Sequence, residues 1–360
     1  MTVFSRYRKN AHPVGQKTTK QAMVLACASV FLALSWSQTA KADGPGFGLP
    51  IACTIGEDCW ITSHVDMDPS SRQHEDWACG PVAYDTHKGT DFGVGTMSQA
   101  VGVDVLAAAA GTVLRTRDGM LDVNSRLAEN SGRDINNCGN GVVIDHGHGW
   151  ETQYCHLREG SVSVRSGDRV NRGDVIGEVG LSGKTEHPHV HFSIRKDDRV
   201  MDPFVGRQAR LGCGADTRDS LWLPDVLITL LAQYDGGLIY NLGFADETPN
   251  RLTARDGQFE HEPLKPSSSK LIFWTDLIGI EQGDQVTMTV ELESETIKKH
   301  VVVSRDVPFE EKGWVQWFGF TGQRIAEDKQ LPKGVYTGTV SLSRPGKGVI
   351  TERHVSTVVE

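Results

Sequence analysis

The feature that most constrains the fold is a series of short β-like runs that alternate with glycine-centred turns from residue 102 onward. Examples are residues 103–106, 141–145 and 175–179, and a last run covers 189–194. Runs this short and frequent, with no long helical period between them, are typical of a compact antiparallel β core. We therefore predict a small, mostly antiparallel β-sheet domain over residues 85–215.

The rest of the chain, residues 216–360, predicts a second β domain. Its candidate strands, separated by polar turns, are residues 226–231, 237–244, 271–277, 286–292, 299–303, 315–320, 335–342 and 351–359. Seven or eight strands over about 140 residues favour a β-sandwich, so the expected fold class is all-β. Trp314, Phe318 and Phe320 share one strand parity, which favours packing in the core over a carbohydrate-binding platform.

The N-terminus has the pattern of an export signal. A basic start without acidic residues precedes an apolar run at 22–36, and Ala40-Lys41-Ala42 gives the small-x-small pattern of a cleavage site. The apolar run is short for a membrane span. We predict a signal peptide over residues 1–42 and no membrane span after its cleavage. Lipidation at Cys27 and an uncleaved anchor are the alternatives.

The charge of the chain argues against a nucleic-acid partner. Residues 1–42 hold six of the 37 Lys and Arg and none of the 46 Asp and Glu, which leaves residues 43–360 with a formal charge of −15. Nucleic-acid-binding domains instead carry a basic face. We therefore predict no nucleic-acid partner.

Six cysteines follow the predicted signal peptide, and all of them precede residue 214. An even number in an exported chain predicts three disulfides, although six cysteines allow 15 pairings and the sequence does not choose among them. Free buried thiols are the alternative. Cys53 and Cys59 are close enough in the sequence to pair, and a bond between Cys138 and Cys155 would brace a hairpin. Cys79 and Cys213 are the pair that then remains. We expect disulfides to hold an irregular lead-in over residues 43–84.

Two short segments have the spacing of metal ligands. His189 and His191 are two residues apart in a β-like run, so their imidazoles point to the same face. His87 and Asp91 are four apart, and Gly89 between them lets a loop turn both side chains inward. Catalytic zinc uses three such ligands and leaves one position for a water, whose pKa the metal lowers to about 7. We therefore predict one Zn2+ per chain, held by His87, Asp91 and one histidine of the final pair.

Taken together, these segments resemble the lysostaphin/LytM-type zinc metallopeptidases of peptidoglycan. The matching elements, in that family's order, are H-x-x-x-D at 87–91, a central strand at 139–147, Y-x-H-L at 154–157, paired glycine turns at 166–180 and P-H-x-H-F at 188–192. The likeness covers roughly residues 85–204. It departs from the family at residues 185–187, where many members have small residues and glycine, and in the long polar loop 118–138.

The resemblance implies a role for each matching residue. His87, Asp91 and His191 are expected to be the zinc ligands, and His156 and His189 the catalytic pair beside the zinc-bound water and the substrate carbonyl oxygen. His187 is expected to line the cleft without binding the metal. The implied fold is a small β domain with the zinc in a groove.

The function that the resemblance implies is an exported zinc endopeptidase that cuts stem peptides or cross-bridges of peptidoglycan. The expected location is the periplasm, with secretion as the alternative. The second β domain is expected to bind a protein partner or the wall. Two other functions remain: a catalytically inactive domain that activates another wall hydrolase, and a secreted protease that acts on proteins.

A further hypothesis concerns the lead-in. His64, Asp66 and Asp68 have ligand-type side chains and could occupy the open zinc position, which would keep the enzyme latent. An ordinary polar loop is the interpretation that we favour for this segment.

Overall fold

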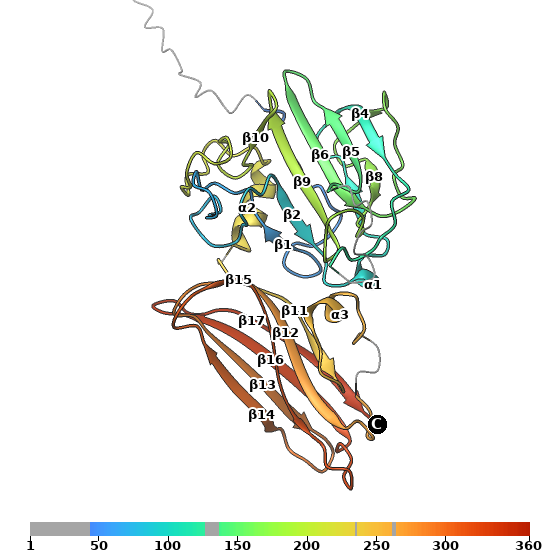
Figure 1. Ribbon diagram of the computed structural model, residues 1–360, viewed down its shortest axis with the longest axis vertical. Helices are drawn as coiled ribbons and strands as arrows, with labels where there is room; N and C mark the ends of the chain where they lie inside the picture. The colour runs from blue at the N-terminus through green and yellow to red at the C-terminus, as the bar shows by residue number, and fades with distance from the viewer. Residues whose placement is uncertain (1–43, 127–136, 235, 261–263) are drawn as a thin grey trace, which may run out of the picture. The chain divides into compact units, whose positions relative to one another are not determined.

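The structure is a computed structural model that describes residues 44–126, 137–234, 236–260 and 264–360. The described residues, drawn in colour in Figure 1, all belong to one compact unit. The predicted signal peptide over residues 1–42 lies outside the described residues. Among the residues that are described, no helix is both long and apolar enough to cross a membrane.

The first half of the chain forms an antiparallel sheet with the strand order β1-β2-β9-β6-β5-β4-β7, and β10 pairs with β9. The strands are β1 (Trp60–Ser63), β2 (Thr90–Gly93), β4 (Gly111–Arg117), β5 (Asn140–Asp145), β6 (Trp150–Leu157), β7 (Arg169–Val170), β9 (His189–Lys196) and β10 (Arg199–Met201). Two further strands, β3 (Asp104–Leu106) and β8 (Val175–Glu178), pair with each other, and α1 (Met97–Ala100) follows β2. The predicted β5–β6 hairpin is present.

Most of the lead-in over residues 44–84 lies outside helices and strands, as predicted, but it packs on this sheet. It contributes β1, which pairs with β2, and Phe47, Ile51 and Met67 are fully buried in the hydrophobic core of this sheet. Burial of large apolar side chains stabilises the fold by roughly 1.5–3 kcal/mol each. The lead-in is therefore part of the hydrophobic core of this sheet.

Three disulfides join the six cysteines. They are Cys53–Cys59, Cys79–Cys213 and Cys138–Cys155. The first closes a short loop in the lead-in, and the second ties the lead-in to residue 213. The third joins the loop before β5 to β6, next to His156.

The second half of the chain forms two antiparallel sheets. One has the order β11-β12-β15 and the other β14-β13-β16-β17. Their strands are β11 (Leu238–Ala245), β12 (Lys270–Ile280), β13 (Gln285–Glu293), β14 (His300–Pro308), β15 (Trp314–Arg324), β16 (Gly334–Arg344) and β17 (Gly348–Val359). On β13, Val286, Met288, Val290 and Leu292 alternate with more exposed residues and share one core with side chains of β11 and β12. The all-β fold class with a second β domain is confirmed.

The prediction of a strand over residues 226–231 is wrong, because this segment lies in the helix α2 (Pro224–Ala232). Pro224 occupies the first turn, where a missing N–H costs nothing. Val226, Leu227, Leu230 and Leu231 recur at helical spacing and pack on the core of the first sheet. A short apolar run of this length is ambiguous between helix and strand, and here the tertiary contacts decide.

The prediction of core packing is wrong for Trp314 and Phe320 and is confirmed for Phe318. Trp314 is 43 % exposed and Phe320 is 36 % exposed, whereas Trp317 packs against the sandwich core. Phe318 stacks on Trp274 on the other face of the sheet, near Phe259. Both faces of β15 therefore carry aromatic residues, so alternation alone could not identify the core side.

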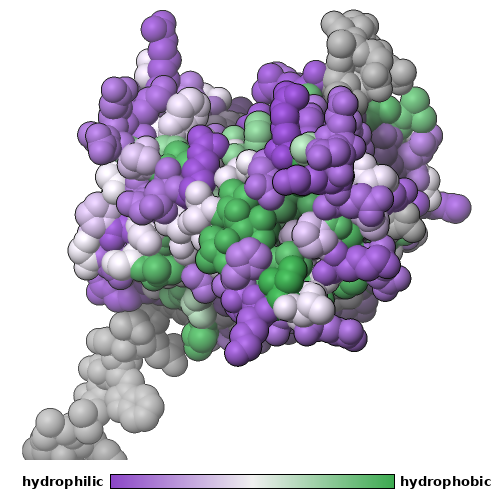
Figure 2. All heavy atoms as spheres, turned by 90° about the horizontal axis from the view of Figure 1, so that it is seen from below, coloured by the Kyte–Doolittle hydropathy of each residue, from purple (hydrophilic) through white to green (hydrophobic). Residues whose placement is uncertain are grey.

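The surface is mixed. Figure 2 shows hydrophobic side chains gathered near the centre of one face, among hydrophilic residues. A third helix, α3 (Arg251–Arg255), follows β11 and begins at Asn250, whose side chain accepts from the N–H groups of Leu252 and Thr253. This cap fixes the start of a helix that carries two arginines toward the site described next.

Candidate metal centre

The pairing of β2 with β9 brings the predicted ligands together. Asp91 on β2 lies directly opposite His191 on β9, and His87 precedes β2 in a tight loop. Gly89 makes this loop possible, because a Cβ at that position would lie 2.6 Å from the carbonyl oxygen of Phe192 and 2.7 Å from the His191 ring. The close approach of the loop to β9 therefore requires glycine.

The three side chains present donor atoms to one point. His191 Nδ1 lies 2.7 Å from Asp91 Oδ1, and His87 Nε2 lies 3.2 Å from Asp91 Oδ1 and 3.1 Å from His191 Nδ1. Tetrahedral zinc with bonds of about 2.0–2.1 Å places its donors roughly 3.3 Å apart. Two imidazole nitrogens and one carboxylate oxygen at these separations fit catalytic zinc with one position left open.

The hydrogen bonds at His87 also favour a cation here. His87 Nδ1 lies 2.6 Å from the carbonyl oxygen of His64, which can only accept, so Nδ1 carries the proton. In the neutral imidazole, Nε2 then turns a lone pair toward the Asp91 carboxylate. Two acceptors at 3.2 Å need a proton or a metal ion between them.

Asp91 is held in its charged form. It is only 3 % exposed, and burial alone would raise its pKa. The imidazoles of His87, His189 and His191 outweigh burial and hold the pKa of this carboxyl well below its usual range. An anionic ligand is thus present at neutral pH.

His156 reaches the centre through an irregularity in β6. The register shifts between Asn140 and Gly141 on β5, and His156 has a φ of 65°, which is rare outside glycine. Its N–H donates to the carbonyl oxygen of Cys138, and its Nδ1 donates to that of Ser182, at 2.8 Å each. The bulge turns the side chain inward, so that its ring lies 6.1 Å from the ring of His191.

His189 is anchored in the same way. Its Nδ1 lies 2.9 Å from the carbonyl oxygen of His187 and 3.2 Å from Thr185 Oγ1, and its Nε2 lies 3.7 Å from Asp91 Oδ1. The rings of His156 and His189 are 4.6 Å apart. Burial lowers the pKa of both imidazoles, which favours the neutral form that can accept a proton.

All five residues singled out in the sequence therefore meet at one place. Among the described residues, two other groups have ligand-type atoms close together, but both consist largely of disulfide-bonded cysteines. A groove beside His87 is lined by Thr86, Lys88, Val200, Gln208, Ala209 and Arg210.

The sequence did not identify the residues that hold the ligands in place. The His64 ring packs among Trp77, Phe204 and Tyr234, and its carbonyl oxygen accepts from His87 Nδ1. Asp66 accepts from the N–H of Thr86 and pairs with Arg210. These contacts do not fit the latency hypothesis, because the His64 ring lies among aromatic side chains, Asp66 pairs with Arg210, and Asp68 accepts from Ser70. A contact made by a backbone carbonyl oxygen depends on the fold and not on the residue type. No sequence motif could therefore have indicated that His64 holds His87.

Comparison with known proteins gives the family. The model of peptidase family M23 matches residues 85–203. The cell division protein DipM of Caulobacter vibrioides is 32% identical over 114 residues, which is 31% of this chain and 17% of that protein. The peptidoglycan DD-endopeptidase ShyA of Vibrio cholerae is 33% identical over 108 residues, 30% of this chain and 20% of that protein.

The chain thus spans about a fifth of the length of these curated relatives. Among solved structures, the catalytic domain of the antimicrobial peptidase lysostaphin from Staphylococcus simulans is similar at 24% identity, over 33% of this chain and 77% of that chain, with a TM-score of 0.23. The resemblance seen in the sequence is confirmed by the family match. Residues 85–203 form a domain of peptidase family M23, the lysostaphin/LytM type of metallopeptidase.

Proposed function

We propose that the protein is an exported zinc endopeptidase that hydrolyses peptide bonds of peptidoglycan. The observation that carries the proposal is the convergence of His87 Nε2, Asp91 Oδ1 and His191 Nδ1, with His156 and His189 beside them. In this proposal the first three residues hold one zinc ion, and the last two carry protons.

When bound, zinc polarises the scissile carbonyl and lowers the pKa of a water molecule. The chain's own residues then position and move the proton. His156 and His189 each donate Nδ1–H to a backbone carbonyl, so each offers an Nε2 lone pair to the centre. A neutral imidazole there accepts the proton of the attacking water, and once protonated it donates to the developing oxyanion or the leaving amine.

The names of the relatives support the substrate class that we propose. Their printed names include a peptidoglycan DD-endopeptidase and a DD-carboxypeptidase/endopeptidase, which supports wall peptides as substrate. The groove beside His87 offers polar side chains and the ammonium group of Lys88, along which a peptide bearing a carboxylate can lie, whereas Arg210 is already paired with Asp66 and Asp85.

We further propose the domain organisation expected from the sequence: a signal peptide over residues 1–42, a lead-in over 43–84, a peptidase domain over 85–215 and an accessory β domain over 216–360. Three disulfides support an oxidising compartment, and the periplasm is the location that we propose. The accessory domain would contact a protein partner or the wall.

The experiment compares the wild type with His191→Ala, both expressed as the full chain with export so that the disulfides form. We expect about one zinc per wild-type chain and release of soluble peptides from purified sacculi, with both lost in the variant. His354→Ala, at an exposed histidine of β17, is the matched control and should retain both.

Other outcomes decide between the alternatives. Bound zinc without release from sacculi, but with cleavage of a soluble protein, would identify a protease of proteins. A folded, oxidised wild type that binds no zinc and releases nothing would identify an inactive activator of another hydrolase.

A further inference from the structure

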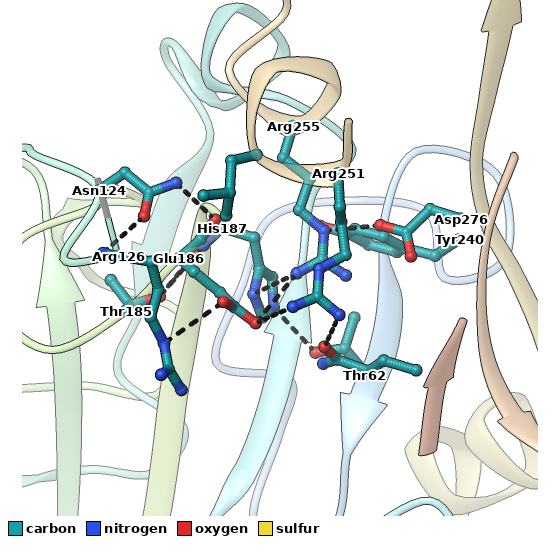
Figure 3. A network of polar contacts seen from close by, with 12 residues as sticks. Thr62, Asn124, Arg126, Thr185, Glu186, His187, Tyr240, Arg251, Arg255 and Asp276 are labelled. Carbon is teal, nitrogen blue, oxygen red and sulfur yellow. Dashed lines mark hydrogen bonds and ion pairs between the residues drawn. The ribbon is translucent and has the colours of Figure 1, made fainter. Parts of the chain in front are cut away.

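The loop 185–187, which departs from the family pattern, lies between the candidate catalytic pair and α3. Figure 3 shows Arg251 and Arg255 pointing from α3 toward Glu186 and His187, with Asp276 of β12 beside Arg255. These arginines lie outside residues 85–203, the segment that matches the peptidase family. The second β region thus contributes side chains to the edge of the centre.

Arg255 is buried and held by a charged partner. Its side chain is 1 % exposed, and Nε donates to Asp276 Oδ2 at 2.6 Å. Its Nη1 lies 3.6 Å from Glu186 Oε1 and 3.5 Å from His187 Nδ1. Among the described residues, Arg255 Nη2 and Asp276 Oδ1 have no hydrogen-bond partner. A buried ion pair with unsatisfied atoms is a poor source of stability, which favours a role in positioning.

The donors and acceptors around His187 form a series of polar contacts in which the direction of each hydrogen bond can be assigned. A guanidinium can only donate, so His187 Nδ1 accepts from Arg255 and the proton of the neutral ring lies on Nε2. His187 Nε2 lies 3.4 Å from Thr62 Oγ1, and Thr62 Oγ1 donates to the carbonyl oxygen of Asp91 at 3.4 Å. The chain of contacts runs from Asp276 through Arg255, His187 and Thr62 to the backbone of a candidate metal ligand.

His187 also holds His189 directly. The two rings stack with centroids 4.5 Å apart and planes 20° apart. The carbonyl oxygen of His187 accepts from His189 Nδ1. A rotation of the His187 ring would therefore remove the surface against which the His189 ring lies.

We propose that Arg255 is a positioning residue for catalysis, which fixes the ring and the Nε2–H tautomer of His187 and thereby the orientation of His189. The effect on kcat that this inference predicts rests on the proposed function. It assigns the second β region a part in completing the catalytic centre, beyond contact with a partner or the wall.

Three variants test it. His187→Phe keeps a ring against His189 but removes both nitrogens. Arg255→Met with Asp276→Leu removes the ion pair without leaving a buried charge alone, and Arg255→Lys keeps the charge. Arg353→Met is the matched control, because the contacts of Arg353 among the described residues are with the carbonyl oxygens of Ile239 and Tyr240 and with the Trp60 ring.

With a soluble cross-linked peptidoglycan peptide as substrate, we expect kcat to fall about 10–100-fold in His187→Phe and in Arg255→Met/Asp276→Leu, as is typical when a supporting residue is lost. In both variants KM should change less than about threefold, and zinc content should stay at one per chain. The kcat of Arg255→Lys should lie between that of the Arg255/Asp276 variant and that of the wild type. Adding His187→Phe to the Arg255/Asp276 variant should lower kcat no further, because both changes break one chain of contacts.

A second readout does not depend on activity. Long-range 1H–15N spectra of histidine-labelled full-length protein should show His187 as the Nε2–H tautomer in the wild type and in Arg353→Met, and lose this signature in the Arg255/Asp276 variant. Three results would overturn the positioning role. The spectra and kcat could be unchanged in the Arg255/Asp276 variant, kcat could fall equally in the Arg353 control, or the decreases in kcat could add in the combined variant. An inactive wild type would instead refute the proposed function, while the spectra still test the tautomer.

Discussion

Replacing His64 by Phe should make the fold less sensitive to acid. The His64 ring is 2 % exposed among Trp77, Phe204 and Tyr234, and its Nδ1 has no hydrogen-bond partner among the described residues. Burial lowers the pKa of His64 from 6.5 to about 4. The folded protein therefore keeps this ring neutral at pH values where the unfolded chain protonates it.

The sign and size follow from proton linkage. Because the folded-state pKa is the lower one, the stability is fully present above pH 6.5 and is lost as the pH falls toward 4. Between pH 7.5 and pH 5 the wild type should lose about 2 kcal/mol through this residue, and the full loss below pH 4 is roughly 3 kcal/mol. Phe is similar in size and does not titrate, so its own cost should stay below about 1.5 kcal/mol.

The assay is urea unfolding at pH 7.5 and pH 5, followed by tryptophan fluorescence. The difference in unfolding free energy between the two pH values should be about 2 kcal/mol smaller in His64→Phe than in the wild type. His300→Phe, at an exposed histidine of β14, should match the wild type. The same pH dependence in His64→Phe and the wild type would refute the reasoning.

Three further predictions follow from the same structure. Replacing Cys138 and Cys155 by Ala opens a bridge with a sequence separation of 17 residues and should lower the unfolding free energy by about 3 kcal/mol, measured in urea without reductant. His156→Ala should leave zinc content at one per chain and reduce peptide release at least about 100-fold, because in the proposed function this residue carries protons and binds no metal; loss of zinc would contradict this. Leu230→Ala in α2 should cost about 2–5 kcal/mol, since Leu230 is buried in the first core, and a cost under 1 kcal/mol would argue against that packing.

Much of the fold could be predicted because local patterns agree with tertiary structure. The alternation along β13 and the turn between β5 and β6 are visible in the sequence, and both elements form as expected. The segment at Leu230 was misjudged because a short apolar run fits either a strand or a helix. Trp314 was misjudged because both faces of β15 carry aromatic residues.

In the candidate site, too, some features could be predicted from the sequence and others could not. The spacing of His189 and His191 and the loop around Gly89 are local, so the sequence could indicate the side chains that meet Asp91. The positive φ of His156, the carbonyl oxygen of His64 and the approach of Arg255 depend on contacts between distant segments. Sequence patterns carry no record of such contacts, so only the structure reveals them.

The most direct test of the central claim is a zinc titration of metal-stripped full-length protein, with release of soluble peptides from purified sacculi as the readout. If His87, Asp91 and His191 form the one catalytic metal site, release should rise linearly with added zinc and reach its plateau at one equivalent per chain. Release that is equally strong without zinc, or absent at every zinc concentration from a folded and oxidised protein, would contradict the account.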